Sequence, residues 1–417
     1  MPSRSPQLGP APRNPVRVYM DNHATTRVDP RVVEAMIPYF SEYYGNAGSV
    51  GHVFGEEARA AVERSRESIA AALGADAKEI VFTSGATESN NLALRGVAER
   101  ERRRGNHLVS VTTEHKAVLD PLARLSRRGY EVTLLSVEQM PSARAGWLDP
   151  ERVADALRDD TCLVSVMLAN NEIGIIQPLA EIAAICKSRG VLLHCDATQA
   201  VGKIPVDVQK LGVDLMSFTA HKMYGPKGIG ALYVCSRAPI VRLDAQVTGG
   251  GQQEGRRAGT LNVPGIVGFA KALELALAEL PTEAPRLTAV RNRLADEIVT
   301  KLDDIQICGP ALDAQNDDGT PLRLPGNLDL SFANVDGEAL LLAMGNLAVS
   351  SGAACSSTDP EPSHVLRALG LSEDAARSSL RFGLGRFNTE LDVDFAVERV
   401  VGAVGKLRSL ATPQGRG

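Results

Sequence analysis

Short hydrophobic runs alternate with longer amphipathic segments over much of the chain. The runs predict strands at Glu79–Thr83, His107–Thr112, Glu131–Ser136, Leu163–Leu168, Val191–His194, Leu215–Phe218 and Ile229–Val234. Helical segments lie between most of these strands. This alternation is typical of a sheet whose strands are mostly parallel and whose two faces carry helices. We therefore predict an α/β fold.

Helical periodicity is clearest in the N-terminal part and after the last predicted strand. It predicts helices at Arg31–Tyr44 and Gly55–Leu73, and an Ala/Leu-rich helix from about Pro264 to Leu280. The charged segment that follows Pro281 predicts a second helix, which enters a different domain. The tail again alternates strands with helices.

Length and composition limit the class of protein. A chain of 417 residues predicts two or three domains. The net charge of -5 shows no basic excess, so we expect no nucleic-acid partner. No apolar run approaches the ~18 residues of a membrane span, so we expect no membrane partner. Residues 1–17 lack the apolar core of a secretory signal and are expected to form a frayed tail of a cytoplasmic protein.

The six cysteines are scattered and form no C-x-x-C pair, so neither a zinc site nor a disulfide framework is predicted. Cys355 differs from the other five, because it lies among small residues and is followed by two prolines. We expect it in an exposed loop, where a thiol is a liability unless it does chemistry. The other cysteines lie in apolar contexts typical of packing.

The segment from Ser217 to Gly230 places a lysine, Lys222, between two hydrophobic strands. Desolvation lowers the pKa of a lysine and makes its amine a nucleophile toward carbonyls. One interpretation is a Schiff-base lysine that carries pyridoxal phosphate. The alternative, about equally favoured by this segment alone, is a solvated turn lysine, and Lys227 in the same turn competes for the role.

The turn Ser84-Gly85-Ala86-Thr87 joins a buried strand to a helix. Free N–H groups and the dipole at a helix N-terminus favour an anion such as a phosphate. The alternative is an ordinary N-cap that binds nothing. Neither a Walker lysine nor a G-x-G-x-x-G pattern is present here, so nucleotide-binding motifs are disfavoured.

Two further polar side chains are expected at the ends of buried strands, where ligands bind in open α/β sheets. Asp196 follows one such strand, where its carboxylate could pair with a pyridinium nitrogen, or could merely cap the next helix. His115 follows another, where its ring could stack on a cofactor or move a proton, although a lone histidine is more often structural.

Two further segments carry candidate polar side chains. Asn171 belongs to the polar cluster Asn170–Gly174, which also follows a buried strand. Arg381 lies inside an apolar strand, where it could bind a carboxylate through two parallel N–H bonds or form a structural ion pair.

Taken together, these segments resemble the pyridoxal-phosphate-dependent cysteine desulfurases of the NifS/IscS type, in the class V aminotransferase group. The matching stretches span about residues 18–390 and include DNHATT, EIVFTSGATESNN, TEHKAVL, HCDATQAVGK, FTAHKMYGPKGIG, RRAGTLNV, LAVSSGAACSS and SSLRFGLGRF. The resemblance implies the PLP-dependent transferase fold type I. It implies a large domain at residues 30–281, with a mostly parallel seven-stranded sheet, and a smaller α+β domain formed by residues 1–29 and 282–417.

The resemblance also implies a role for each candidate residue. Lys222 would hold the cofactor covalently, Asp196 would pair with its ring nitrogen, His115 would stack on the ring, and Gln199 would bond the ring hydroxyl. The phosphate would be held by Ala86, Thr87, Thr219 and His221, with Thr260 reaching it from the other subunit of a homodimer. Asn171 and Arg381 would bind the substrate carboxylate, Asn171 also lying at the cofactor, and Cys355 would accept the sulfur.

The activity implied is the conversion of L-cysteine to L-alanine, which leaves a persulfide on Cys355. The implied partner is an iron–sulfur scaffold or another sulfur-acceptor protein, and no metal site is implied. Within the same fold, a selenocysteine lyase or an aminotransferase is an alternative. A non-catalytic sulfur-transfer scaffold is an alternative of another class, although it would have no need of both Lys222 and Cys355.

Overall fold

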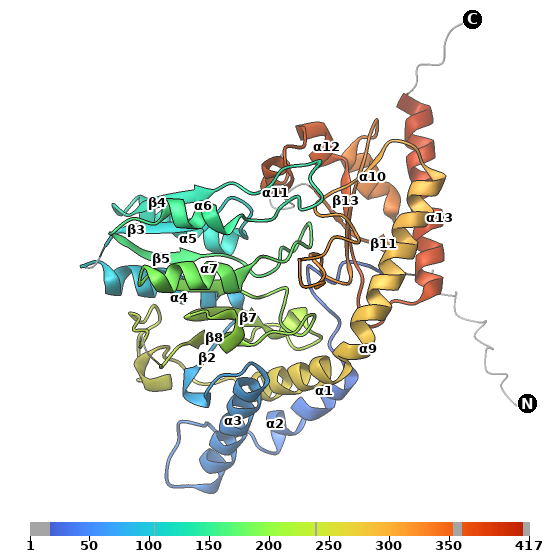
Figure 1. The fold of residues 1–417 in the computed structure, drawn as a ribbon. Coiled ribbons are helices and arrows are strands. Elements are labelled where there is room, and N and C mark those ends of the chain that lie inside the picture. The colour runs from blue at the N-terminus through green and yellow to red at the C-terminus, as the bar shows by residue number, and fades with distance from the viewer. Residues whose placement is uncertain (1–16, 104, 238–239, 353–360, 412–417) are drawn as a thin grey trace, which may run out of the picture.

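The computed structural model describes residues 17–103, 105–237, 240–352 and 361–411, and its centre is a seven-stranded sheet (Figure 1). The sheet order is β2-β8-β7-β6-β5-β3-β4. Its strands are β2 (Ile80–Thr83), β3 (His107–Val111), β4 (Glu131–Leu135), β5 (Thr161–Ser165), β6 (Leu192–Asp196), β7 (Leu215–Thr219) and β8 (Gly230–Val234). All seven predicted strands are thus present, with ends shifted by a few residues.

The direction of the strands confirms the mostly parallel prediction. Strands β3 to β7 pair in parallel, whereas β8 is antiparallel to both of its neighbours, β7 and β2. Two consecutive strands that pair in parallel need a long crossover connection. The connection between β7 and β8 is too short for one, because it holds only the turn that carries Lys222. Because β2 runs in the same direction as β7, the C-terminal ends of β2, β3, β5, β6 and β7 meet at one edge of the sheet.

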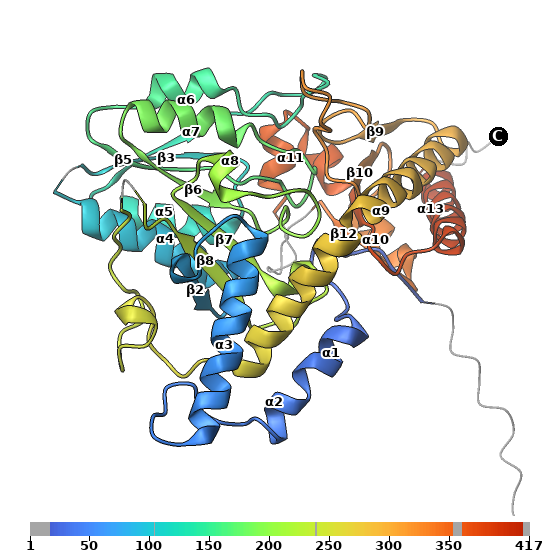
Figure 2. The same ribbon diagram turned by 60° about the horizontal axis from the view of Figure 1, so that its bottom comes forward.

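Helices cover both faces of this sheet (Figure 2). One face carries α4 (Ala86–Glu101) and α5 (Lys116–Ser126), whose apolar residues form one core with the strands. The opposite face carries α3 (Val53–Ala72), α6 (Pro150–Ala156), α7 (Leu179–Ser188), α8 (Val208–Leu211) and the first half of α9 (Val263–Lys301). Burial on both faces explains why the strands read as continuous hydrophobic runs.

A smaller α+β unit forms a separate hydrophobic core. Its four-stranded sheet has the order β12-β13-β10-β9, and β1 pairs in parallel with β11 beside it. The strands are β1 (Val18–Tyr19), β9 (Ile305–Ile307), β10 (Asn327–Phe332), β11 (Leu347–Ala348), β12 (Ser350–Ser351) and β13 (Ser379–Gly383). The helices of this core are α10 (Gly337–Met344), α13 (Glu390–Ala411) and the second half of α9. The helices α11 (His364–Ala368) and α12 (Glu373–Arg377) instead place their buried apolar residues in a core of the large sheet. The division into two domains and its boundaries stay a prediction.

Two helix predictions were wrong in extent. The segment Arg31–Tyr44 forms two helices, α1 (Pro30–Met36) and α2 (Pro38–Ser41). Ile37 between them keeps helical geometry, and the break falls at Pro38, which has no N–H to continue the helical hydrogen bonds. Conversely, the helices expected on either side of Pro281 are one continuous helix, α9. Its packing against α1, α3 and α13 offsets the hydrogen bonds that Pro281 and Pro285 remove.

The described residues contain no helix with the length and hydropathy needed to cross a bilayer. They also contain no group of three or more His, Cys, Asp or Glu side chains arranged to hold a metal ion.

Candidate active site

A cavity of about 640 Å³ opens at the edge where the parallel strands end. It is lined by the turns that follow β2, β3, β5, β6 and β7, by residues 23–25 and by Arg381 of the smaller unit. Ligand sites in open α/β sheets lie at this position, since several strand ends converge there. The cavity brings together most of the candidate residues: Ala86, Thr87, His115, Asn171, Asp196, Gln199, Thr219, His221, Lys222 and Arg381.

Lys222 ends the short 3-10 helix η2 (Ala220–Lys222), directly after β7. Its Nζ donates to the main-chain oxygens of His23 at 2.5 Å and Ala24 at 2.7 Å. Burial, with a smaller contribution from the nearby Arg381 guanidinium, lowers the pKa of the Lys222 amine to about 8. Lys227 also lines the cavity but is exposed, so the geometry favours Lys222 as the nucleophilic amine.

Asp196 is the last residue of β6, rather than lying just past the strand as the sequence predicted. Its Oδ2 accepts a hydrogen bond from Asn90 at 2.7 Å, and its Oδ1 accepts one from the Thr198 main-chain N–H at 3.0 Å. Each carboxylate oxygen can accept two bonds, so one position on each remains. The two donors hold the carboxylate in place at the cavity wall and stabilise its charge.

The first turn of α4 lies at the cavity wall. Gly85 is the N-cap and offers no side chain, so the N–H groups of the first turn are not capped by it. His221 also lines the cavity, and burial, followed by Lys222, lowers the pKa of its ring to about 4. The Thr219 hydroxyl, by contrast, donates its proton to the Ile229 oxygen at 2.9 Å, so in this geometry it does not donate into the cavity.

His115 caps the next helix, α5, by accepting the Ala117 N–H on its Nδ1 at 3.0 Å. Its ring nevertheless lines the cavity, where burial lowers the pKa of the imidazole. Nδ1 is thus occupied by the helix cap, and a role for Nε2 toward a ligand or proton stays a prediction.

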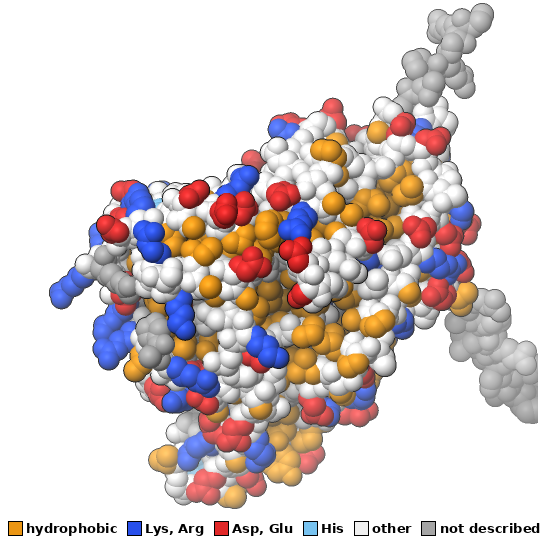
Figure 3. All heavy atoms as spheres, in the orientation of Figure 1, with side chains coloured by type: hydrophobic (Ala, Val, Ile, Leu, Met, Phe, Trp, Pro, Cys, Tyr) orange, Lys and Arg blue, Asp and Glu red, His pale blue; other side chains and the backbone are white. Residues whose placement is uncertain are grey.

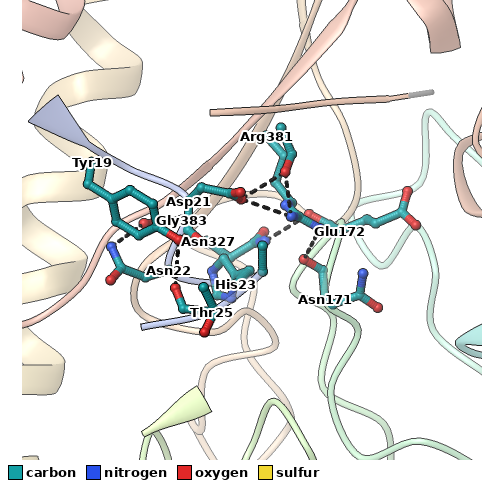
Figure 4. A network of polar contacts seen from close by, with 12 residues as sticks. Tyr19, Asp21, Asn22, His23, Thr25, Asn171, Glu172, Asn327, Arg381 and Gly383 are labelled. Atoms are coloured by element: carbon teal, nitrogen blue, oxygen red, sulfur yellow. Dashed lines mark hydrogen bonds and ion pairs between the residues drawn. The ribbon is translucent and has the colours of Figure 1, made fainter. Parts of the chain in front are cut away.

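Arg381 on β13 forms an ion pair, one of the two alternatives that the sequence left open, and binding of a substrate carboxylate stays a prediction (Figure 4). Its Nη2 forms an ion pair with Asp21 at 3.0 Å and donates to the Ser350 hydroxyl at 2.8 Å. Its Nη1 donates to the main-chain oxygen of Asn171 at 3.3 Å. These contacts hold the guanidinium at the cavity wall, with part of its donor capacity unused.

Two candidate residues lie outside this constellation. Thr260 is exposed and is not among the cavity-lining residues of its own chain, so its predicted action on a second subunit stays a prediction. Cys355 lies outside the described residues. Of the other five cysteines, Cys162, Cys186, Cys195 and Cys308 are buried, and Cys235 is partly buried, which agrees with a packing role.

Five residues that contribute to the cavity were not predicted from the sequence. The first group, which follows β1 and lines the cavity, is His23, Ala24 and Thr25. The Thr25 hydroxyl forms a hydrogen bond of 3.1 Å with Nδ1 of His221, a residue nearly two hundred positions later in the chain. Asn90 lies one helical turn inside α4, and the Thr198 hydroxyl is buried and unpaired at the cavity wall. The polar run DNHATT was the available signal for the first group, because polar residues after a strand mark a ligand site.

Comparisons with known proteins agree with this architecture. The family described as Aminotransferase class-V matches residues 18–395. "Cysteine desulfurase IscS" of Anaeromyxobacter dehalogenans (strain 2CP-C) is 55% identical over 396 residues, covering 95% of this chain and 94% of the relative. "Cysteine desulfurase" of Homo sapiens is 48% identical over 407 residues, covering 98% of this chain and 85% of the relative.

A solved structure titled "NIFS-LIKE PROTEIN" aligns with a TM-score of 0.83 at 39% identity, covering 94% of this chain and 100% of that chain. Its likeness confirms the expected fold type I. The chain therefore belongs to the class-V aminotransferase family and, within it, to the cysteine desulfurases of the NifS/IscS type.

Proposed function

We propose that this protein is a cysteine desulfurase that uses pyridoxal phosphate to convert L-cysteine to L-alanine and passes the sulfur to Cys355. The observation that carries the proposal is the convergence of a lysine amine of lowered pKa, a buried carboxylate and an arginine on one cavity. A nucleophilic amine, a partner for a ring nitrogen and a carboxylate-binding group are the three features that this reaction requires of a protein.

The residues present fit pyridoxal phosphate. The uncapped N-terminus of α4 and His221 suit a phosphate, and the spare acceptor positions of Asp196 suit a protonated ring nitrogen. The unpaired hydroxyl of Thr198 leaves a polar group at the wall for a ligand to satisfy. Lys222 would hold the aldehyde carbon, and Gln199 the ring oxygen. When bound, the cofactor would supply a sink for the electrons left at the substrate α-carbon.

The side chains then divide the work. Arg381 binds the carboxylate of cysteine and orients its α-carbon in the cavity. The Lys222 amine removes the α-proton, for which a pKa of about 8 suits a base that acts near neutral pH. The Cys355 thiolate attacks the substrate sulfur, the carbon–sulfur bond breaks with its electrons left on the substrate carbon, and protonation of that carbon completes alanine. The sulfur remains on Cys355 as a persulfide.

We further propose that the active form is a homodimer. Large apolar side chains are exposed from α1 to the start of α3, including Phe40 (65%) on α2, and Tyr44 (63%) and Val50 (78%) in the segment between α2 and α3. Figure 3 shows hydrophobic side chains at the lower edge of the molecule, over these helices. Contiguous apolar surface of this kind marks an interaction site. A second copy would also bring its Thr260 to the phosphate, as the family resemblance implies.

A sulfur acceptor must take the persulfide, and an iron–sulfur scaffold is the acceptor that the resemblance to IscS-type proteins supports. The chain does not identify that acceptor, and other sulfur-acceptor proteins are the alternative.

The products separate the proposed reaction from its rivals. Purified protein, loaded with pyridoxal phosphate and given L-cysteine and a thiol reductant, is expected to form alanine and sulfide in equal amounts. A keto acid with an aminated cofactor would indicate an aminotransferase, and turnover confined to selenocysteine would indicate a lyase. The Lys222→Ala variant is the control, and equal product formation by that variant would refute the proposal.

A further inference from the structure

A second lysine, Lys203, lies behind the cavity wall and has no role in the reaction described above. The main-chain bonds from Val201 N to Ala197 O and from Lys203 N to Ala200 O coil residues 197–204 into a helical turn. This turn places Gln199 and Lys203, four residues apart, on one face. The Lys203 Nζ donates to Gln199 Oε1 at 2.6 Å.

Gln199 separates Lys203 from the substrate cavity. Gln199 lines the large cavity, whereas Lys203 lines a separate space of about 30 Å³ on the other side, large enough for about one water molecule. His23 lines both spaces. Lys203 therefore acts on the cavity through the amide of Gln199 rather than by touching a ligand.

The surroundings of the Lys203 amine disfavour its charged form. Burial lowers the pKa of its amine well below the usual value, and the nearby Lys222 and Arg381 lower it further. A lysine that is largely removed from water is usually paired with an acid. Glu283 lines the same small space, but the bond of the Lys203 amine that the structure shows goes to the neutral amide of Gln199.

This bond bears on which of two possible orientations the Gln199 amide adopts. As observed, Oε1 faces both Lys203 and the Nδ1 of His23 (3.1 Å), and Nε2 donates to the His23 main-chain oxygen at 2.8 Å. The neutral His23 ring can donate or accept at Nδ1 according to its tautomer, so it tolerates either orientation. A flipped amide would lose the bond from the Lys203 Nζ to Oε1 and would set Oε1 against the main-chain oxygen of His23, so Lys203 and the His23 backbone both favour the observed orientation.

We propose that Lys203 is a positioning residue that fixes the orientation of the Gln199 amide, so that one Nε2–H stays available to the ring oxygen of the cofactor. A primary amide carries two N–H donors, and His23 uses one of them. With Oε1 held by Lys203, the second N–H remains on the side that serves the cavity. The inference rests on the proposed function, since it takes pyridoxal phosphate as the ligand of Gln199.

The test uses the apoprotein and pyridoxal phosphate itself, so it does not depend on turnover. Lys203→Met removes the donor with little change in length, and Lys210→Met on α8, whose side chain is exposed, is the matched control. We expect Lys203→Met to weaken cofactor binding about tenfold, the worth of one hydrogen bond to a charged group. We also expect a shift in the absorption spectrum of the bound cofactor and in the pH at which that spectrum changes. The hydrogen bond from Gln199 to the ring oxygen affects the ionisation of the cofactor that this pH dependence reports.

Two further variants keep the inference falsifiable. In a Gln199→Leu background, Lys203→Met should have no additional effect on affinity or spectrum, because its route of action has been removed. Gln199→Glu keeps the contact with Lys203 but loses the donor, and should reproduce the spectral shift even if Lys203→Met fails to fold. Lys203→Arg, which retains an N–H donor, should restore the spectrum.

The outcomes also separate this inference from the proposed function. If Gln199→Leu binds the cofactor with the wild-type affinity and spectrum, the role of Gln199 is wrong. If Gln199→Leu or Gln199→Glu shifts the spectrum but Lys203→Met does not, or if the effects of Lys203→Met and Gln199→Leu simply add, the positioning role of Lys203 is refuted. Failure to bind pyridoxal phosphate by the wild-type protein would instead refute the proposed function.

Discussion

The amine of Lys222 lies 2.5 Å from the main-chain oxygen of His23, a residue about two hundred positions earlier in the chain. The neighbouring oxygen of Ala24 accepts from the same amine at 2.7 Å. A neutral amine that donates two N–H bonds keeps its lone pair free, and this lone pair is the group that attacks a carbonyl carbon. The N-terminal segment thus orients the nucleophile at a turn that the sequence alone leaves ambiguous between two lysines.

This relationship predicts which lysine holds the cofactor. Borohydride reduction of the loaded protein should fix pyridoxal phosphate to the peptide that contains Lys222, and Lys222→Ala should lose measurable turnover. Lys227→Ala, which removes the exposed lysine of the same cavity, should retain the covalent label. Peptide mapping by mass spectrometry decides the matter, and a label on Lys227 would overturn the assignment.

The lowered pKa of Lys222 predicts a pH dependence with a definite sign. Only the neutral amine reacts with an aldehyde, and burial lowers the pKa of this amine from the ordinary 10.5 to about 8. The rate at which apoprotein captures pyridoxal phosphate should therefore rise as the pH increases from 7 and level off above a midpoint near 8. Stopped-flow absorbance over this range gives the midpoint. A rate still rising toward pH 10 would mean that the amine is not desolvated.

Asp196 is predicted to act through its charge. Asp196→Asn keeps the size of the side chain but removes the charge that would hold a ring nitrogen protonated, so turnover should fall by about 100-fold or more. Cofactor binding should persist, because the other contacts remain. The control is Asp207→Asn, which alters an acid that caps α8. Steady-state alanine formation measures the effect, and an unchanged rate would exclude the electron-sink role.

The exposed apolar side chains over α1 to α3 predict that charge introduced there will break a dimer. Phe40→Glu combined with Val50→Glu should yield a monomer of low activity, because burying two carboxylates in an apolar interface is costly. Leu342→Glu, at a residue of α10 that is 81% exposed, is the matched control and should leave the dimer intact. Light scattering reports the mass. A wild-type monomer with full activity would end the proposal.

The sequence predicted the large sheet well, because strands buried on both faces give unbroken hydrophobic runs. It failed where tertiary contacts overrule local signals. Pro281 marks a break by local rules, yet α9 continues through it because three other helices pack along it. The carboxamide of Gln253 pairs with both main-chain groups of Phe82 on the edge strand β2, at 2.7 and 2.8 Å, and no pattern along the chain announces such a contact.

Within the site, motifs at strand ends identified Asp196, His115 and Lys222. The supporting contacts from Asn90, His23 and Lys203 were not predicted, because they depend on which distant segments the fold brings together. Gln199 shows the difference most clearly: its place in the cavity follows from a strand end, but the orientation of its amide depends on Lys203 and His23.

The fate of the sulfur atom tests the central claim most directly. Loaded protein is given one equivalent of L-cysteine without reductant, and alanine is quantified while the thiols are trapped and their peptides are mapped by mass spectrometry. We predict one alanine for each persulfide, with the added sulfur on the peptide that contains Cys355. We predict neither persulfide nor normal alanine formation in Cys355→Ser. Alanine released by Cys355→Ser at the wild-type rate, or a persulfide on another cysteine, would contradict the account.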